Sequence, residues 1–292
     1  MKEILLYRGC TTPVRLPAYE ASTKLVLERL GVKVIDMVDT TCCGSQYVES
    51  LNSKAFTAMG ARILALAERE GKDILAICGA CSGSLKHTKH ILDSDESLRK
   101  KVNSILAHED LEYTGKAAVK HLLQIFKEDI GFKTIERAVS KPYRGVRLAA
   151  HYGCHVTRPH EIVKVDDPEN PTIIDRIIEF TGATSVDYTG KTRCCGGPLL
   201  GMDESLAEEI GKEKVNNILD AGAKGIITAC AFCDIQLTQA QLGEGIKKGK
   251  RIPVIPLPQF LGAALGIQDD ILGFHLNKIS AEPILATLKG AR

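Results

Sequence analysis

Cysteine is the residue type in this sequence most suited to chemistry, and its spacing is ordered. The 292-residue chain contains ten cysteines, which are Cys10, Cys42, Cys43, Cys78, Cys81, Cys154, Cys194, Cys195, Cys230 and Cys233. The first five follow the spacing C-x31-CC-x34-C-x2-C, and the last five follow C-x39-CC-x34-C-x2-C. The pattern therefore occurs twice and accounts for every cysteine.

The residues around the cysteines repeat as well, which indicates an internal duplication. The two CC pairs and the two CxxC motifs are both separated by 152 residues (194 − 42 and 230 − 78). Residues 5–10 correspond to 149–154, and residues 74–81 correspond to 226–233. Cysteines that only filled a core would not keep such a register.

Composition restricts the classes of protein to which the chain can belong. Lys and Arg total 38 and Asp and Glu total 36, so the formal net charge is +2. This balance argues against nucleic acid or an anionic membrane surface as a partner. Arg8 and Gly9 interrupt the short apolar start, and no apolar run reaches the ~18 residues of a membrane span. We therefore expect a cytoplasmic protein without direct membrane insertion, in which thiols stay reduced.

Reduced thiols in this pattern favour metal ligation or redox chemistry. A thioredoxin-like dithiol at Cys78 and Cys81 would leave three cysteines of its own set unexplained. A structural zinc ion takes four thiolates, one fewer than each set offers. An iron–sulfur cluster also normally takes four cysteines, so five indicate an unusual cluster or one cysteine that bridges irons or reacts. Spacing alone leaves these alternatives open.

Short apolar runs alternate with longer amphipathic stretches, which is typical of an α/β fold. We expect strands at residues 3–8, 32–37, 73–77, 146–151, 184–188, 225–229 and 252–255. We expect helices at residues 18–30, 53–70, from about Ser82, 172–180, 204–221 and 258–265, with 95–140 mostly helical. The cysteines then follow the carboxyl ends of strands, where open α/β sheets place ligands.

Proline and glycine mark a boundary between the two halves of the chain. Pro142 and Gly145 lie in the stretch 141–145, where such residues interrupt regular structure. We therefore expect an N-terminal domain at residues 1–144 and a C-terminal domain at residues 145–292.

The cysteine pattern resembles the CCG domain, and two such domains in tandem resemble the B subunit of heterodisulfide reductase. The resemblance rests on C-x31-CCG-x33-C-x2-C with its near-copy, and on residues 151–155 (HYGCH) and 194–198 (CCGGP). It extends from Cys10 to about residue 265. It implies two similar Rossmann-like CCG domains related by duplication.

The resemblance also implies a noncubane [4Fe-4S] cluster in each domain. The first cluster would be held by Cys10, Cys42, Cys43, Cys78 and Cys81. The second would be held by Cys154, Cys194, Cys195, Cys230 and Cys233. In the resembled family, the small-molecule disulfide of coenzyme M and coenzyme B is cleaved between the two clusters. Cys43, Cys195 and His155 are the residues that we predict to be catalytic.

Two histidines, His151 and His155, flank the first cysteine of the second set. Both lie close to Cys154 and would donate protons or hydrogen bonds near a substrate. The alternative is that each is a packed or solvated histidine without a role in the reaction.

The sequence contains no glycine-rich motif of the kind that binds the phosphates of a nucleotide, so we expect neither flavin nor nicotinamide in this chain. Electrons must then come from partners, which the resemblance implies are a ferredoxin-like C subunit, the direct donor, and the flavin-containing A subunit.

Two other functions remain open from the sequence. A related complex of sulfur oxidisers would use the same clusters on protein-bound or other thiol or disulfide sulfur. A non-catalytic electron-transfer or zinc-binding subunit would keep the cysteines without turning over a substrate.

Overall fold

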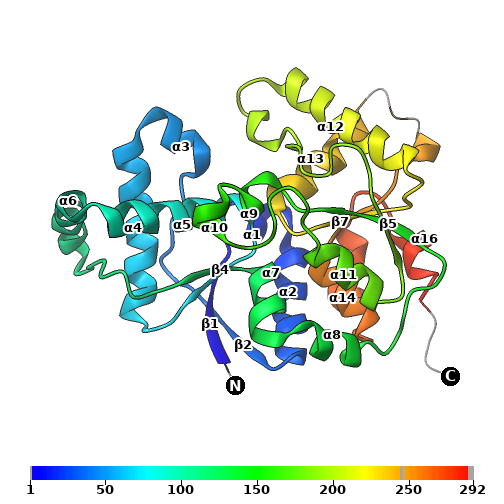
Figure 1. Cartoon of the computed structure of the whole chain (residues 1–292), viewed down its shortest axis with the longest axis horizontal. Helices are drawn as coiled ribbons and strands as arrows, with labels where there is room; N and C mark the ends of the chain where they lie inside the picture. Colours follow the sequence, from blue (N-terminus) through cyan, green and yellow to red (C-terminus); the bar gives the residue numbers. More distant parts are fainter. Residues whose placement is uncertain (1, 244–245, 247, 289–292) are drawn as a thin grey trace.

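The computed structural model describes residues 2–243, 246 and 248–288, which form two similar α/β halves side by side (Figure 1). Each half contains a four-stranded parallel sheet, which confirms the predicted fold class and its duplication. The first sheet has the strand order β2 (Val32–Asp36), β1 (Lys2–Tyr7), β3 (Ile74–Ala76) and β4 (Val119–His121). The second has the order β6 (Thr184–Val186), β5 (Arg147–His151), β7 (Ile226–Thr228) and β8 (Val254–Pro256).

Helices connect the strands in both halves. Those of the first half are α1 (Thr12–Arg15), α2 (Pro17–Arg29), α3 (Ser45–Leu51), α4 (Ser53–Arg69), α5 (Gly79–Ser94), α6 (Glu96–Leu106), η1 (Ala107–Glu109), α7 (Leu122–Gln124), the π-helix η2 (Ile125–Ile130) and α8 (Phe132–Ala138). Those of the second half are α9 (Cys154–Thr157), α10 (His160–Val163), α11 (Ile173–Phe180), η3 (Gly197–Leu199), α12 (Glu204–Asp220), α13 (Ala231–Leu242), η4 (Lys248–Lys250), α14 (Leu257–Ala264), α15 (Asp269–Leu272), η5 (Phe274–Leu276) and α16 (Glu282–Leu285).

The order of the strands determines where a ligand can bind. From β1 the chain crosses to β2 on one side, whereas β3 and β4 lie on the other side of β1. The connections therefore diverge between β1 and β3, and they diverge in the same way between β5 and β7. In open α/β sheets, the carboxyl ends of the strands at such a switch point border a crevice that binds ligands.

The central strands are almost entirely apolar because helices cover both faces of each sheet. Ile4, Leu6, Ile74 and Leu75 have no exposed surface, and the second half repeats this burial in β5 and β7. Near-continuous apolar strands are the usual composition of a parallel sheet buried on both faces.

The two halves share packing contacts along their border. Helix α2 of the first half packs on α14 of the second, and α5 packs on α9 and α10. The ring of Tyr143 stacks on Phe260 with centroids 4.5 Å apart, and the Tyr143 hydroxyl donates to the Phe260 carbonyl at 2.9 Å. Residues just before position 144 therefore already contact the second half, and the domain boundary expected there stays a prediction.

The expectation that residues 95–140 are mostly helical is confirmed, but it missed a strand. Strand β4, with Val119 and His121 at its ends, pairs in parallel with β3 within this stretch. Three residues are too short to show a period of two, so only pairing with a neighbouring strand reveals them. Helix α3 is a further element that the sequence pattern does not predict.

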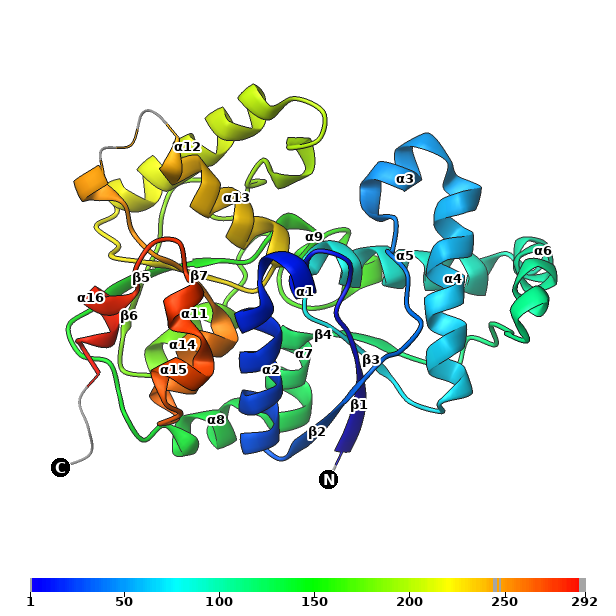
Figure 2. The same ribbon diagram turned by 180° about the vertical axis from the view of Figure 1, so that it is seen from behind.

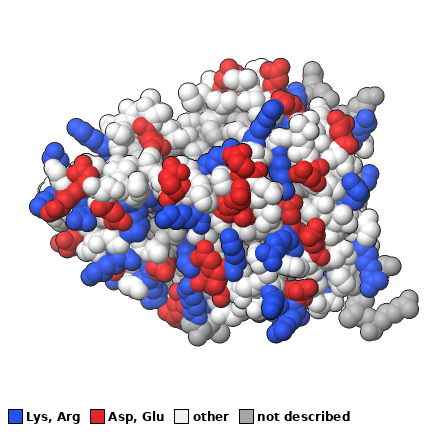
Figure 3. Space-filling model, in the orientation of Figure 1, with Lys and Arg blue, Asp and Glu red and all other residues white. Residues whose placement is uncertain are grey.

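None of the helices in the described part of the chain is long and apolar enough to cross a membrane. Charged side chains of both signs are interspersed over the face shown in Figure 3.

Candidate metal centre

The first set of cysteines comes together at the carboxyl edge of the first sheet. Cys10 follows β1, the pair Cys42 and Cys43 follows β2, and Cys78 and Cys81 join β3 to α5. The thiols of Cys10 and Cys42 are hydrogen-bond neighbours, and the sulfurs of Cys43 and Cys81 are 3.6 Å apart. The five side chains thus form a continuous row of sulfur atoms.

The second set repeats this arrangement at the carboxyl edge of the second sheet. Cys154 follows β5, Cys194 and Cys195 follow β6, and Cys230 and Cys233 join β7 to α13. The thiols of Cys154 and Cys194 are hydrogen-bond neighbours, and the sulfurs of Cys195 and Cys233 are 3.4 Å apart. All ten cysteines are free thiols.

The two sets meet at the border between the halves. The sulfurs of Cys78 and Cys230, the first cysteines of the two CxxC motifs, are 3.9 Å apart. Helices α1, α5 and α9 gather in the middle of the molecule (Figures 1 and 2). The ten thiols therefore form one array that crosses from one half to the other.

Glycines allow the backbone to approach these sulfurs closely. Gly9 has φ +69°, and a Cβ there would lie 3.0 Å from the sulfur of Cys81. Gly153, its equivalent, has φ +80°, and a Cβ there would lie 3.2 Å from the sulfur of Cys233. Both glycines combine a left-handed backbone with contact to a thiol, so an L side chain would be strained and crowded.

Backbone N–H groups add polar contacts to the CC pairs. The Gly44 nitrogen lies 3.4 Å from the Cys42 sulfur and donates to it, and Gly196 donates to Cys194 at the same distance. Such N–H···S bonds favour the thiolate, which is the form that binds metals.

Thiols within each set also alter one another's ionisation. Hydrogen bonds from Cys154 and Cys195 lower the pKa of Cys194 to about 2. Neighbouring thiols hold the pKa of Cys43 well below its usual value in the same way. Each set therefore contains a cysteine that readily becomes a thiolate, as the first step of metal binding requires.

The donor set fits an iron–sulfur cluster. Each half offers five soft sulfur donors, mostly buried, at strand ends that bring sequence-distant cysteines together. Tetrahedral zinc would use four of them and leave one thiol without a metal, whereas a cluster with several irons has coordination positions for more thiolates.

The two centres differ at one strand end. Tyr7 ends β1 and His151 ends β5 at the equivalent position. The Tyr7 hydroxyl donates to the Thr41 carbonyl at 2.8 Å, whereas His151 Nδ1 lies 3.2 Å from the Tyr188 hydroxyl. Burial, with a contribution from the charge of Lys214, lowers the pKa of His151 to about 3. The imidazole is therefore neutral at physiological pH.

A cation supports the loop before each CC pair, and the sequence pattern did not point to either one. The Lys214 ammonium donates to the Gly190 carbonyl at 2.5 Å, and the Arg62 guanidinium donates to the Asp39 carbonyl at 2.6 Å. The two cations are 152 residues apart (214 − 62), the same offset as the cysteine motifs. Applying the 152-residue offset of the cysteine motifs to the helices α4 and α12 would have identified Arg62 and Lys214 as an equivalent pair.

His155 borders a solvent-open groove beside the second centre. The groove has a volume of about 570 Å³ and is lined by Cys154, His155, Arg158 and Glu169, among others. His155 also faces the first half, since a Cβ on Gly83 would lie 3.1 Å from its carbonyl oxygen. The structure thus brings His155 next to the predicted ligand Cys154, and its catalytic role stays a prediction.

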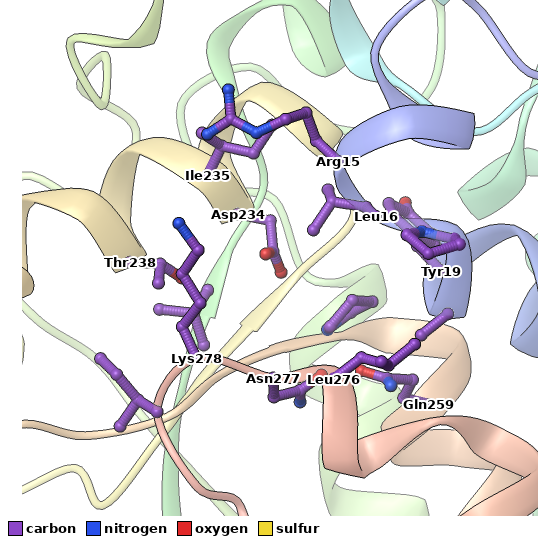
Figure 4. Close-up of a pocket in the computed structure, with 15 residues that line it drawn as sticks. Arg15, Leu16, Tyr19, Asp234, Ile235, Thr238, Gln259, Leu276, Asn277 and Lys278 are labelled. Atoms are coloured by element: carbon purple, nitrogen blue, oxygen red, sulfur yellow. The ribbon is translucent and has the colours of Figure 1, made fainter.

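A separate cavity of about 80 Å³ lies between the halves, lined by Tyr19 and Asp234 among others (Figure 4). In the described part of the chain, Gln259 Oε1 and Asn277 Nδ2 are buried there without a hydrogen-bond partner. Its volume corresponds to roughly two or three water molecules, which would satisfy these groups.

A family model matches both halves of the chain, and known proteins match it over nearly its full length. The family model "Cysteine-rich domain" (CCG) matches residues 4–86 and 148–238. The B subunit of the ferredoxin/F420H2-dependent CoB-CoM heterodisulfide reductase of Methanosarcina acetivorans is 35% identical, covering 99% of this chain and 97% of that protein. A protein of Archaeoglobus profundus, named as similar to the heterodisulfide reductase B subunit, is 32% identical, covering 91% of both.

Two further proteins extend the comparison. The 8-methylmenaquinol:fumarate reductase membrane anchor subunit of Wolinella succinogenes is 29% identical, covering 96% of this chain and 98% of that protein. The crystal structure of a hypothetical protein from Helicobacter pylori shares the fold, with a TM-score of 0.76 at 17% identity, and covers 96% of this chain and 52% of that one. Taken with the duplicated cysteine motif, these similarities show that the chain belongs to the family of the heterodisulfide reductase B subunit, built from two cysteine-rich CCG domains.

Proposed function

We propose that the chain holds two noncubane [4Fe-4S] clusters and serves as the catalytic subunit of a heterodisulfide reductase-like complex. The observation that carries the proposal is the array of ten thiols, five at each switch point, joined by the 3.9 Å contact between Cys78 and Cys230. A disulfide has two sulfur atoms, and two similar metal centres side by side suit its symmetric cleavage.

In this proposal the first cluster is held by Cys10, Cys42, Cys43, Cys78 and Cys81. The second is held by Cys154, Cys194, Cys195, Cys230 and Cys233. Bound clusters would supply one-electron transfer and iron with affinity for sulfur. The net reaction is a disulfide plus two electrons plus two protons giving two thiols.

The protein's own groups would bind the substrate and move its protons. The groove beside Cys154 admits a small molecule, and its wall carries Arg158, whose guanidinium pairs with Glu169 at 3.3 Å. His155 borders the same groove, and in this proposal its imidazole delivers a proton to a departing thiolate. Cys43 and Cys195 are the central cysteines of the two rows, each in sulfur contact with the CxxC motif of its own half.

Electrons would arrive through partner proteins. Two relatives of this chain are named as the B subunit of ferredoxin-linked reductases, which supports a multi-subunit assembly. The direct donor that we propose is a ferredoxin-like C subunit, which would itself receive electrons from the flavin-containing A subunit. The cytoplasm is the compartment in which ten free thiols would stay reduced.

Metal analysis and turnover together test this function. An anaerobically purified chain should contain about eight irons and eight acid-labile sulfides, as two four-iron clusters require. The complex should reduce the coenzyme M–coenzyme B disulfide, and Cys43→Ala or Cys195→Ala should abolish the reaction. A chain with zinc and no iron, or full activity in either variant, would contradict the proposal.

A second candidate uses the same clusters with a different substrate. The 29% identity to a protein of a menaquinol:fumarate reductase shows that this architecture also occurs outside enzymes named for the heterodisulfide. An iron-replete complex that fails to reduce the coenzyme disulfide would favour this candidate, or a sulfur-oxidising complex acting on other thiol or disulfide sulfur.

A further inference from the structure

The second centre contains a buried nitrogen that the first centre lacks. His151 has no exposed surface, and its Nε2 has no hydrogen-bond partner in the described part of the chain. The ligand atoms of His151, Cys195 and Cys233 all lie within 4.8 Å of one another. A buried polar atom without a partner is costly, so the position of this imidazole beside two sulfurs requires an explanation.

The other side of the imidazole determines which nitrogen carries the proton. The Tyr188 hydroxyl lies 3.2 Å from His151 Nδ1 and 3.2 Å from the Ala150 carbonyl oxygen. It has one proton and can donate it to either acceptor. When it donates to Nδ1, the histidine proton is on Nε2 and is directed into the metal centre.

Metal binding favours that tautomer. Cysteines release their protons when they bind a metal, so the sulfurs facing His151 become acceptors with negative charge. A lone pair on Nε2 would repel them, whereas an Nε2–H would form a charge-assisted hydrogen bond. The Tyr188 hydroxyl can redirect its proton from the Ala150 carbonyl to Nδ1 without moving its oxygen, because both acceptors lie 3.2 Å away.

The equivalent group of the first centre has no such proton to offer. Tyr7 is buried at the end of β1, and its hydroxyl already donates to the Thr41 carbonyl at 2.8 Å. The duplicated motif therefore repeats its cysteines but not this buried hydrogen-bond donor.

We propose that His151 donates an N–H···S hydrogen bond to a ligand sulfur of the second centre and thereby makes the two centres unequal in reduction potential. This inference rests on the proposed pair of clusters. A hydrogen bond to a ligand sulfur stabilises the reduced, more negative state of a cluster and raises its potential. The second centre is therefore reduced first, and His151 is a positioning residue that gives electron flow a direction between the two sites.

The test is a redox titration of the anaerobic, iron-loaded protein followed by electron paramagnetic resonance. The wild-type chain should show two distinct midpoint potentials.

Three variants test the origin of the difference. His151→Phe keeps an aromatic ring without the N–H, so the higher potential should fall toward the lower one at unchanged iron content. Tyr188→Phe keeps the imidazole but removes the group that orients it, and should cause a smaller fall. Tyr7→Phe is the matched control in the first half and should leave both potentials in place.

The outcomes separate this inference from the proposed function. A chain without iron contradicts the clusters themselves. Full iron with unchanged potentials in His151→Phe would overturn the hydrogen bond while leaving the clusters intact. Loss of about half the iron in His151→Phe, with unchanged potentials in Tyr188→Phe, would also overturn it, because His151 would then act as a ligand or a packing residue.

Discussion

Gly9 stands immediately before the first cysteine in a left-handed conformation, and a Cβ there would meet the sulfur of Cys81 at 3.0 Å. We expect Gly9→Ala to displace that sulfur and to empty the first centre, lowering the iron content from about eight to about four per chain. Gly31→Ala is the matched control, because Gly31 has φ +87° but a Cβ there would have nothing within 4 Å. Both variants carry roughly 1–2 kcal/mol of backbone strain, so equal iron loss in the two would show that strain alone is responsible.

The residue scale also shows what the sequence could and could not predict. Spacing grouped the ten cysteines into two sets because a duplicated motif keeps its register over 152 residues (194 − 42). Spacing placed His151 near Cys154 but did not reveal its partner Tyr188, which comes from a different strand end. A contact between single side chains from separate elements leaves no periodic signal in the sequence.

At the scale of elements, His121 links β4 to the second half. Its Nδ1 accepts from the Leu123 backbone N–H at 3.2 Å and caps α7, and its Nε2 donates to the Ala229 carbonyl at 3.0 Å. His121→Asn should keep the cap but leave the buried Ala229 carbonyl unpaired, at a cost of about 1–3 kcal/mol. His121→Phe should lose the cap too, at a further cost of about 1 kcal/mol.

Thermal unfolding of the anaerobic holoprotein measures both losses, since 1 kcal/mol corresponds to roughly 2 °C in a chain of this size. Equal midpoints for His121→Asn and His121→Phe would show that the cap contributes nothing. A wild-type midpoint in His121→Asn would show that the bond to Ala229 does not stabilise the border between the halves.

The same element shows why prediction failed where it did. Long elements with clear patterns were predicted to within a residue or so: α4 was expected at 53–70 and spans Ser53–Arg69, and α12 was expected at 204–221 and spans Glu204–Asp220. Strand β4 has only three residues, and its pairing with β3 depends on tertiary contacts. Short elements of this kind carry too few residues for a hydrophobic period.

At the scale of the whole molecule, helix α5 packs the first half closely against the second. Gly79 and Gly83 lie one turn apart on α5; a Cβ on Gly79 would meet Val156 Cγ2 at 2.5 Å, and one on Gly83 would meet the His155 carbonyl oxygen at 3.1 Å. Small residues at these positions let α5 approach α9 closely. This approach also sets the contact between the two CxxC motifs, since α5 and α13 each begin directly after the first cysteine of their motif.

Gly83→Val tests whether this close approach holds the two halves as one unit. The added side chain has no room beside the His155 backbone, so we expect overpacking to cost about 1–3 kcal/mol, which corresponds to a fall of roughly 2–6 °C in the thermal midpoint of the holoprotein. His90→Val places the same residue on the exposed face of the same helix and should change stability by no more than about 0.5 kcal/mol. If Gly83→Val were as stable as His90→Val, the halves would not depend on this contact, and the juxtaposition of the two metal centres would have to come from α2 and α14 instead.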